Sequence, residues 1–265
     1  MAKLLKVLVH GITGKMGKEV LSAVNKQSDM KIVAGVSQTV LQTNLENSNQ
    51  HQIPVSTNLE EMIKVYEPDV IVDFTNAKAA LQASRIAASA GINIVIGSTG
   101  FTKENLTEIE GLAKTNNVSI FIASNFAIGA ILIMQMSKLV GKFFDYADIV
   151  EMHHEAKIDS PSGTALSIAS KLLEGKDSGF IKTTSEKETV EGTRGGEIDG
   201  VTIHSVRMPG RMAHHQVILG TQGQTLTLSH DTISRECYMP GVLLAIREVV
   251  KRKGVMVGLE KLLDM

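Results

Sequence analysis

The 265-residue chain is predicted to fold as an α/β protein of two domains. From residue 6 to about residue 126, short apolar runs alternate with segments of helical periodicity, which is typical of a parallel sheet with crossover helices. From residue 127 onward a long helix is followed by strands in which apolar and polar residues alternate. This change of pattern predicts a second domain of the α+β class, with a mixed or antiparallel sheet.

The first domain is expected to contain five buried strands, at residues 6–10, 30–36, 69–74, 92–97 and 118–124. Helices are expected between them. Apolar residues recur at helical spacing from Met16 to Val24, and Asn58 with Glu61 has the spacing of a capping box. A further helix, 77–90, is expected to end at Gly91.

The second domain is expected to begin with a helix at 127–144, a strand at 148–153 and a helix at 163–173. The polar, glycine-rich stretch 174–200 has no apolar period and is expected to be a mobile loop. Three antiparallel strands are expected after it, and a last helix with Pro240 in its first turn. The strands are placed at 201–207, 216–220 and 224–230, and the helix at 238–251.

The composition excludes several classes of protein. The chain has 27 Lys and Arg against 28 Asp and Glu, so it lacks the basic excess of nucleic-acid-binding or membrane-surface proteins. Its one cysteine, Cys237, excludes an intrachain disulfide and a cysteine-based zinc cluster. We find neither a signal-peptide pattern nor an apolar run of about 18 residues, and expect a cytoplasmic protein that acts on a small molecule.

A glycine-rich turn follows the first predicted strand and opens the first predicted helix. Glycines permit a tight turn and let the backbone approach a pyrophosphate, while the helix N-terminus offers N–H groups to the anion. The spacing is G-x-x-G-x-x-G, so it departs from the G-x-G-x-x-G fingerprint, and a tight turn without ligand is the alternative. Its position favours a dinucleotide site in a Rossmann-like domain. The residues expected to contact the dinucleotide here are Gly11, Ile12, Thr13, Gly14, Lys15 and Met16.

Three later segments lie at the carboxyl ends of predicted strands, where open α/β sheets bind ligands. Ser37 and Gln38 stand where many dinucleotide-binding domains carry an acid for the ribose. Without that acid a 2′-phosphate is not repelled, so we expect NADPH and NADH both to be used, with a modest preference for NADPH; an ordinary polar loop is the alternative. The other two segments are Gly97, Ser98 and Thr99, and Ala123, Ser124, Asn125 and Phe126.

The densest cluster of chemical groups is the run EMHHEAKIDSPSGTA, residues 151–165. His153 and His154 leave a predicted strand, Lys157 follows, and a Ser-Gly-Thr turn opens a helix. A titratable proton donor, a fixed cation and backbone N–H groups suit a carboxylate-bearing substrate that gains a proton. The alternative is one packed and one solvated histidine beside a helix cap. No metal is expected, because adjacent strand residues diverge and the other histidines lack ligand spacing.

The same run closely resembles the signature of dihydrodipicolinate reductases. GITGKMG, IVDFTNA, VIGSTGF, FIASNFAIG, IHSVRMPG and HDTISRECYMPGVLLAI agree in order, so the resemblance spans essentially the whole chain. It implies hydride transfer from NADH or NADPH to a cyclic imine dicarboxylate, giving tetrahydrodipicolinate in lysine and diaminopimelate biosynthesis. It also implies a homotetramer formed through the sheet of the second domain, 127–235, and a first domain, 1–126, completed by 236–265.

The resemblance implies a role for each residue of the cluster. His153 matches the proton donor and Lys157 the lysine that supports this step. His154, Gly163 and Thr164 match the contacts to the substrate carboxylates. Two alternatives stay open at this point: another two-domain Rossmann dehydrogenase, and a module that senses the dinucleotide without chemistry. A semialdehyde dehydrogenase would need a thiolate nucleophile, and Cys237 lies apart from the histidine run in the sequence.

Overall fold

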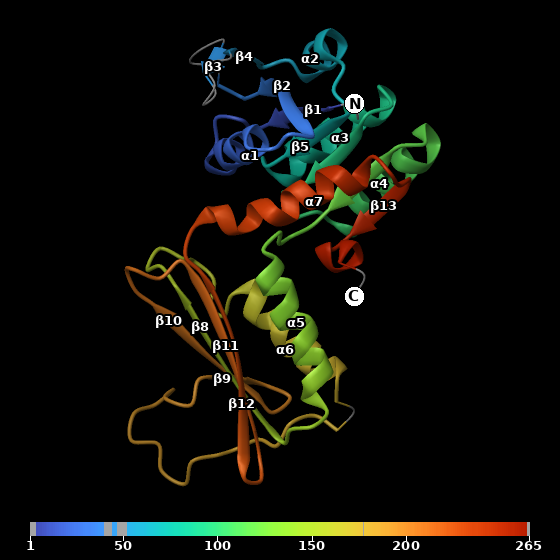
Figure 1. Cartoon of the computed structure of the whole chain (residues 1–265). Coiled ribbons are helices and arrows are strands. Elements are labelled where there is room, and N and C mark those ends of the chain that lie inside the picture. The colour runs from blue at the N-terminus through green and yellow to red at the C-terminus, as the bar shows by residue number, and fades with distance from the viewer. Residues whose placement is uncertain (1–3, 40–43, 47–51, 177, 264–265) are drawn as a thin grey trace. The chain divides into compact units, whose positions relative to one another are not determined.

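The computed structural model describes residues 4–39, 44–46, 52–176 and 178–263. The chain divides into two compact units (Figure 1). Unit 1 comprises Met1–Ala127 and Arg235–Met265, and unit 2 comprises Ile128–Ser234. The fold class predicted from the sequence is confirmed, since a parallel sheet with helices and a mixed-sheet unit are both present.

Unit 1 is built on an eight-stranded sheet in the order β13-β7-β6-β5-β1-β2-β4-β3. All neighbouring strands run parallel except β3, which is antiparallel to β4. The strands are β1 (Leu5–His10), β2 (Met30–Val36), β3 (Asn44–Glu46), β4 (Gln52–Ser56), β5 (Val70–Asp73), β6 (Asn93–Ile96), β7 (Ser119–Ile122) and β13 (Gly254–Val257). The carboxyl ends of β1, β2, β5, β6 and β7 therefore lie on one edge.

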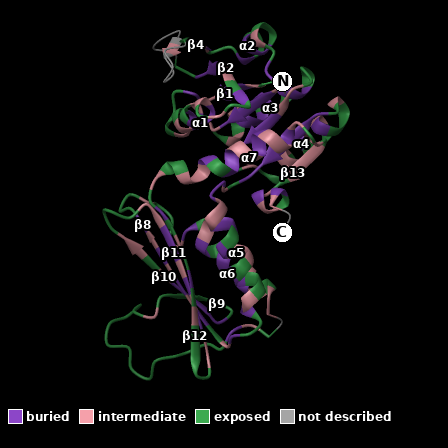
Figure 2. Ribbon diagram, in the orientation of Figure 1, coloured by how far each residue is buried: buried purple, intermediate pink, exposed green. Residues whose placement is uncertain are grey.

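Some helices of unit 1 begin where the sequence supplies a capping side chain. Asn58 accepts from the Glu61 N–H at 3.1 Å, and Asn76 accepts from the Ala79 N–H at 3.1 Å. The helices and short 3₁₀ turns of unit 1 are α1 (Lys15–Asn25), α2 (Leu59–Tyr66), α3 (Ala77–Ser89), α4 (Lys103–Asn116), η1 (Arg235–Tyr238), α7 (Met239–Val249) and η2 (Leu259–Leu262). Figure 2 shows the buried residues concentrated on the strands and the helix sides that face them.

Unit 2 holds a five-stranded sheet in the order β12-β11-β8-β10-β9. Its elements are α5 (Ile128–Gly141), β8 (Tyr146–His153), α6 (Gly163–Glu174), β9 (Gly196–Ile198), β10 (Val201–Arg207), β11 (Ala213–Thr221) and β12 (Gln224–Thr232). The antiparallel arrangement predicted for 201–207 is confirmed against β9 but is wrong against β8, to which β10 runs parallel. The connection between them contains α6 and a long segment, which suffices for a crossover that returns the chain in the same direction.

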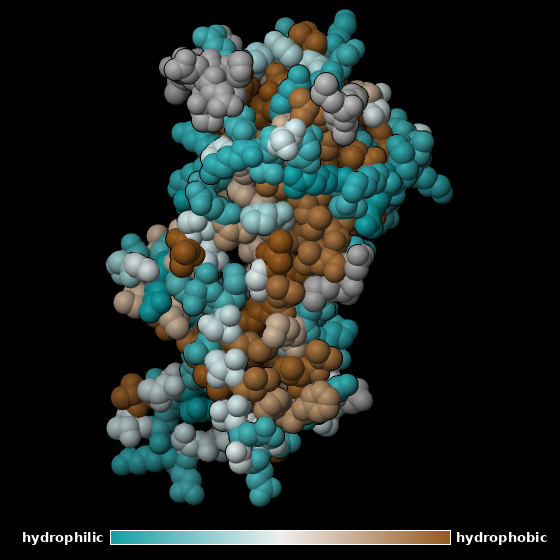
Figure 3. All heavy atoms as spheres, viewed as in Figure 1, coloured by the Kyte–Doolittle hydropathy of each residue, from teal (hydrophilic) through white to brown (hydrophobic). Residues whose placement is uncertain are grey.

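Helices α5 and α6 lie on one side of this sheet (Figure 1). The core between them is formed by residues such as Ile149, Ile168, Leu172 and Val217. The other side of α5 is apolar as well, and Figure 3 shows hydrophobic side chains gathered there. The most exposed large apolar residue of α5 is Leu139, at 63%.

Several elements differ from the sequence prediction. Helix 127–144 is shorter, as α5 ends at Gly141, and the stretch 174–200, expected to be a loop, contains β9. Helix α4 was not predicted because it is largely polar and buries only Ile109 and Ala113. Strand β13 was missed because its four residues are at most half-buried and form an edge. Among the described residues, no helix combines the length and hydropathy needed to cross a bilayer.

Candidate functional site

The glycine-rich turn after β1 is held by close backbone contacts. Gly11 has a positive φ of 86°, and its N–H donates to the Val36 carbonyl at 2.8 Å. A Cβ added at Gly17 would lie 2.1 Å from the Gly11 carbonyl oxygen. The turn therefore requires glycine at both positions, because the first turn of α1 lies directly against the loop.

The N-terminus of α1 is open to an anion. Gly14 is the N-cap residue and supplies no side-chain cap, and Lys15, the first helical residue, is exposed. The first N–H groups of a helix carry positive partial charge and lack intrahelical acceptors. This arrangement fits a dinucleotide pyrophosphate. Ile12 is fully buried, so only its backbone can face such a ligand.

Ser37 and Gln38 follow β2 beside this turn. The Ser37 and Thr13 hydroxyl oxygens lie 2.5 Å apart, and the Ser37 hydroxyl also donates to the Thr39 carbonyl at 3.1 Å. Ser37 is buried, whereas Gln38 is exposed. The structure thus brings Ser37 against the glycine turn, with its hydroxyl already in a local hydrogen-bond network.

A buried carboxylate, which we did not identify from the sequence, joins the ends of three strands. Asp73, at the end of β5, is fully buried and lies 2.5 Å from Nδ1 of His10, the last residue of β1. Ser98, after β6, donates its hydroxyl to Asp73 at 2.6 Å, and the Thr75 N–H donates at 3.2 Å. The signal available in the sequence was that His10 ends one predicted strand and Asp73 is the next-to-last residue of another, at the edge where ligands bind.

The remaining predicted dinucleotide contacts also lie at this edge. Gly97 follows β6, and a Cβ there would lie 2.0 Å from the Phe74 ring. The Phe74 and Phe126 ring centroids are 5.7 Å apart. Thr99 and Ser124 are exposed, while Asn125 accepts from the Ala127 N–H at 2.9 Å. The whole set thus lies at one edge of the sheet, as a cradle of glycines and hydroxyls beside the N-terminal N–H groups of α1.

His153 ends β8 in unit 2, and the residue is 7% exposed. Glu151 lies two residues earlier on the same face of the strand and is fully buried; its carboxylate accepts a hydrogen bond from His153 Nδ1. The neighbouring His154 is exposed. The two histidines diverge at the strand end, so only His153 belongs to the buried cluster.

Arg207 at the end of β10 completes the array. Its Nη1 and Nη2 atoms donate to the two carboxylate oxygens of Glu151, at 3.0 and 2.7 Å. The Ser162 N–H, at the N-cap of α6, donates to the same carboxylate at 3.3 Å. Burial raises the pKa of Glu151, but the hydrogen bonds from Arg207, Ser205 and His153 outweigh it, so the pKa lies below the ordinary value. Glu151 is therefore ionised at neutral pH.

The pKa of His153 is lowered, chiefly by burial, although Glu151 opposes this shift. His215 of β11 faces it, with the ring centroids 5.4 Å apart, and its Nε2 lies 3.2 Å from the Ser162 hydroxyl. Burial, followed by the charge of His153, lowers the pKa of His215 to about 4. His215 is consequently neutral near pH 7, and His153 is the more readily protonated of the two.

Lys157 and the start of α6 are linked through Asp159. The Lys157 ammonium donates to the Asp159 carboxylate at 2.6 Å, and the Gly163 N–H donates to it as well. Lys157 lowers the pKa of Asp159, so this carboxylate is ionised. The carboxylate of Asp159 thus occupies two of the groups, Lys157 and the Gly163 N–H, that were predicted to serve the substrate. Thr164 is the next residue of the helix and is half-buried.

The sequence prediction missed Glu151, Arg207 and His215 as members of this site. Glu151 could have been found from strand periodicity, since it stands two residues before His153. Arg207 and His215 could not be found in this way. Their positions in the site depend on the register of the strand pairs, in which Arg207 lies beside His153 and His215 lies beside Glu151.

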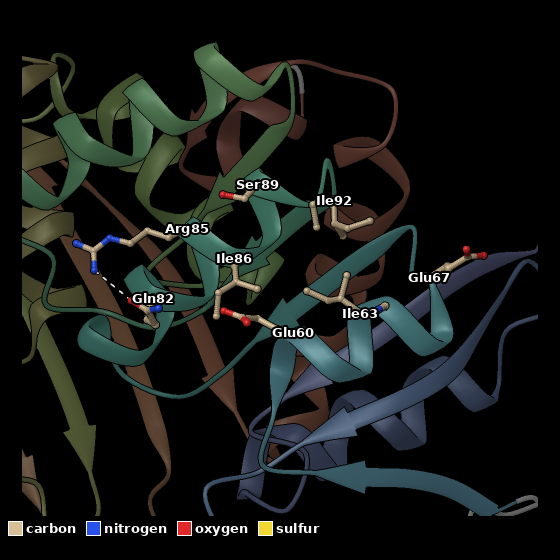
Figure 4. A pocket seen from close by; sticks show the side chains of 10 residues that line it. Glu60, Ile63, Glu67, Gln82, Arg85, Ile86, Ser89 and Ile92 are labelled. Atoms are coloured by element: carbon tan, nitrogen blue, oxygen red, sulfur yellow. Dashed lines mark hydrogen bonds between the residues drawn. The ribbon is translucent and has the colours of Figure 1, made fainter.

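Other groups in the described part of the chain offer less chemistry. There, no cluster of three or more His, Cys, Asp and Glu could hold a metal ion. A hollow of about 680 Å³ between α2 and α3 has Ile63 and Ile86 among its lining residues (Figure 4). Arg85 at its rim donates to Gln82 at 3.2 Å and pairs with Glu108 of α4. This hollow contains none of the predicted site residues.

Comparison with known proteins gives one consistent family. The model described as dihydrodipicolinate reductase, N-terminus, matches residues 5–126, and the model of its C-terminus matches residues 129–263. A 4-hydroxy-tetrahydrodipicolinate reductase of Dehalococcoides mccartyi is 47% identical over 98% of this chain and 99% of its own length. One from Listeria monocytogenes is 38% identical over 98% of this chain and its full length.

Solved structures agree. The dipicolinate-bound dihydrodipicolinate reductase of Paenisporosarcina sp. TG-14 is 38% identical, with a TM-score of 0.87 over 97% of this chain and 99% of that one. An amine dehydrogenase of Mycobacterium smegmatis is similar with a TM-score of 0.63 at 14% identity over 95% of this chain and 94% of that one, which shows a shared fold alone.

Proposed function

Because the chain belongs to the dihydrodipicolinate reductase family, whose members are pyridine-nucleotide-dependent reductases of lysine and diaminopimelate biosynthesis, we propose that His153 and Lys157 carry the protonation step. The reaction is the reduction of 4-hydroxy-tetrahydrodipicolinate, or the derived dihydrodipicolinate, to tetrahydrodipicolinate. The observation that supports the assignment best is the buried His153 beside the N-terminus of α6 and Lys157.

The reduction requires a hydride and a proton. When bound, the reduced nicotinamide supplies the hydride to the ring carbon conjugated with the C=N bond. The electron pair of the conjugated C=C bond then shifts toward the C=N group, whose own pair moves to the nitrogen and leaves an anionic enamine. Protonation of the carbon next to the attacked carbon re-forms the C=N bond. His153 donates this proton from Nε2, since Nδ1 is bonded to Glu151. Solvent returns the proton to His153 in the next cycle.

The same surroundings make His153 a competent acid. Burial lowers its pKa, and the positive charges of Lys157 and Arg207 lower it further, while Glu151 raises it. A histidine whose pKa lies somewhat below the ordinary value gives up its proton more readily than a solvated one. Lys157 would also stabilise negative charge that develops on the substrate.

The substrate carboxylates are proposed to bind at the start of α6 and at the exposed His154. A Cβ at Gly163 would meet no atom within 4 Å, so packing does not require a glycine there. A glycine at this position instead leaves the helix N-terminus accessible to an anion. Asp159 supports this location. Its carboxylate accepts hydrogen bonds from the Lys157 ammonium and the Gly163 N–H, so a carboxylate fits against these two donors.

The cradle of unit 1 is proposed to hold the dinucleotide through Gly11–Met16, Ser37 and Gln38, Gly97–Thr99 and Ala123–Phe126. We propose that both NADH and NADPH are used, with NADPH preferred by about tenfold, or about 1.4 kcal/mol. No carboxylate at 37 or 38 repels a 2′-phosphate, and Lys15 or Lys18 could face it. Neither lysine lies in the Ser37 loop, so the preference is expected to be modest.

Self-association and location are further parts of the proposal. In unit 2, α5 and α6 cover one side of the sheet, and Val150 and Ile218 on its strands are only half-buried. A homotetramer through this sheet would cover such residues. Light scattering coupled to gel filtration measures the expected mass of about four chains of 28.6 kDa. We also propose a cytoplasmic location, which cell fractionation would test.

The test is an absorbance assay of NADPH oxidation with enzymatically generated substrate. The wild-type chain is expected to turn over, and His153→Ala to lower kcat by about 100-fold or more. His154→Ala is the matched control for proton transfer and is expected to raise KM more than it lowers kcat. Near-normal kcat in His153→Ala would contradict the assignment of the proton donor. No oxidation of either dinucleotide by the wild type would contradict the proposed reaction.

A further inference from the structure

On the premise that His153 is the proton donor of the proposed function, we infer that Glu151 is a positioning residue for it. The Glu151 carboxylate accepts the hydrogen of His153 Nδ1, so the proton to be transferred is carried on Nε2. Arg207 in turn holds the carboxylate in place. Glu151 is not expected to touch the substrate.

The geometry leaves Glu151 little freedom. Its Oε1 accepts from Arg207 Nη2 at 2.7 Å and from the Ser162 N–H at 3.3 Å. Its Oε2 accepts from Arg207 Nη1 at 3.0 Å and from His153 Nδ1. Each oxygen thus accepts from two of these groups, which lie on a second strand, at a helix N-terminus and on the histidine, and the Ser205 side chain also donates to the carboxylate. The carboxylate is fully buried, so water does not compete for these hydrogen bonds.

The fixed carboxylate determines the tautomer of His153. A carboxylate that is ionised and held by Arg207 can only accept a hydrogen bond, so the ring nitrogen facing it must carry hydrogen. In the neutral ring this leaves Nε2 without hydrogen and able to take up a proton from solvent. After protonation, Nε2 is the nitrogen that can release it, because Nδ1–H stays bonded to Glu151.

The charges around His153 show why the carboxylate matters for its titration. Four groups face the ring: Glu151 on the same strand, Arg207 on β10, His215 on β11 and Lys157 in the following turn. Burial and the two cations lower the pKa of His153, and Glu151 is the group among these that raises it. Without its charge, His153 would lose its proton at a lower pH and would be less protonated at neutral pH.

A purely structural role is the competing explanation, because the Glu151–Arg207 pair also ties β8 to β10. Such a role would change stability but not the titration of His153. Glu151→Gln separates the two explanations, since glutamine keeps the shape of the side chain and removes the charge. Asp148→Asn is the matched control: Asp148 lies on the same strand and pairs with His204 Nε2 at 2.9 Å, an analogous carboxylate–histidine contact.

Two readouts test the inference on the full-length chain. In the pH profile of kcat, activity is lost as pH rises through the pKa of the donor, and Glu151→Gln is expected to move this limb down by about one unit. Near neutral pH, kcat should then fall by about tenfold. Asp148→Asn should leave the limb in place. Glu151→Asp keeps the charge and should retain the position of the limb even if kcat is lower.

The second readout is nitrogen NMR of the ¹⁵N-histidine-labelled chain without substrate. Neutral His153 of the wild type is expected to be the Nδ1–H tautomer, and its titration midpoint should fall by about one unit in Glu151→Gln. An Nε2–H tautomer in the wild type, or an unchanged midpoint in folded Glu151→Gln, would overturn the inference. If Glu151→Gln does not fold, the wild-type tautomer decides. Because this measurement needs no turnover, it stands even if the proposed reaction fails.

Discussion

In the described part of the chain, a buried carboxylate is bonded to a histidine at the end of a strand in each unit, and the two pairs differ in their other partners. In unit 1, Asp73 faces His10 and receives its remaining hydrogen bonds from neutral groups, the Thr75 N–H and hydroxyl and the Ser98 hydroxyl. In unit 2, Glu151 faces His153 and is balanced by the guanidinium of Arg207.

The difference shows how one motif can serve two purposes. Asp73 ties three strand ends together with uncharged donors, which suits a rigid cradle for a bound dinucleotide. Glu151 is held by a cation, so His153 is oriented by a carboxylate whose charge is largely compensated, and its proton is not retained too strongly. Under the proposed function, the first pair organises a binding edge and the second organises a proton donor.

The largest effect is expected at the cation beside the second pair. Lys157→Ala should lower kcat by about 100-fold, because it removes positive charge that favours release of the His153 proton and stabilises the substrate. Dinucleotide affinity should stay unchanged, as measured by fluorescence titration. Lys171→Ala, at an exposed ion pair with Glu174 on α6, is the control and should retain wild-type kcat. Full activity of Lys157→Ala would contradict its role.

The first pair is broken by Asp73→Asn. The amide cannot accept all the hydrogen bonds that the carboxylate receives, so unfolding free energy should fall by about 1–3 kcal/mol in urea titrations. Asp29→Asn removes the partner of Arg247 from an exposed pair in the same unit and should lower stability by less than about 1 kcal/mol. Equal losses in both variants would mean that the buried network adds nothing beyond a surface contact.

The ribose end of the cradle gives a smaller effect. Ser37→Asp should shift the ratio of kcat/KM for NADPH over NADH by about tenfold toward NADH, since a carboxylate repels the 2′-phosphate. Glu61→Gln, in the first turn of α2, is the control and should leave the ratio unchanged. A ratio unaffected by Ser37→Asp would show that this position does not contact the ribose.

The smallest effect is expected at Asp159, whose carboxylate holds the Lys157 ammonium and the Gly163 N–H. Asp159→Asn removes this competing negative charge, so dipicolinate, the ligand of the Paenisporosarcina structure, should bind a few-fold more tightly. Calorimetry with the dinucleotide present measures the change. Weaker binding of dipicolinate would show that Asp159 keeps its hydrogen-bond donors in place for the ligand and does not compete with the ligand for them.

The arrangement of the glycine-turn edge in unit 1 was easier to predict from the sequence than the cluster around His153 in unit 2. The residues from His10 to Gly17 form a strand, turn and helix within one short segment, so local pattern was sufficient. His153, Lys157 and Gly163 could be assigned to one site for the same reason, because they also lie within one short segment of the sequence. Arg207 could not, because its place beside His153 depends on β10 entering the sheet parallel to β8, and the alternating pattern of 201–207 does not specify direction.

Asp73 was missed for a different reason. It ends a buried apolar run, and its partners His10 and Ser98 come from two other strand ends, so no single segment contains the network. Strand ends could be predicted, but the order β6-β5-β1 that brings these three side chains together is a property of the folded sheet. Local patterns therefore predict backbone turns, whereas networks of buried side chains depend on strand order and register.

The most direct measurement compares His10→Ala with His153→Ala in two assays, NADPH affinity by fluorescence titration and kcat with generated substrate. We predict that His153→Ala loses about 100-fold or more in kcat with affinity within about twofold of wild type. His10→Ala should retain kcat within about threefold and bind NADPH several-fold more weakly. A loss of kcat in His10→Ala as large as in His153→Ala, with NADPH affinity unchanged, would contradict the division between a binding pair and a proton-donating pair.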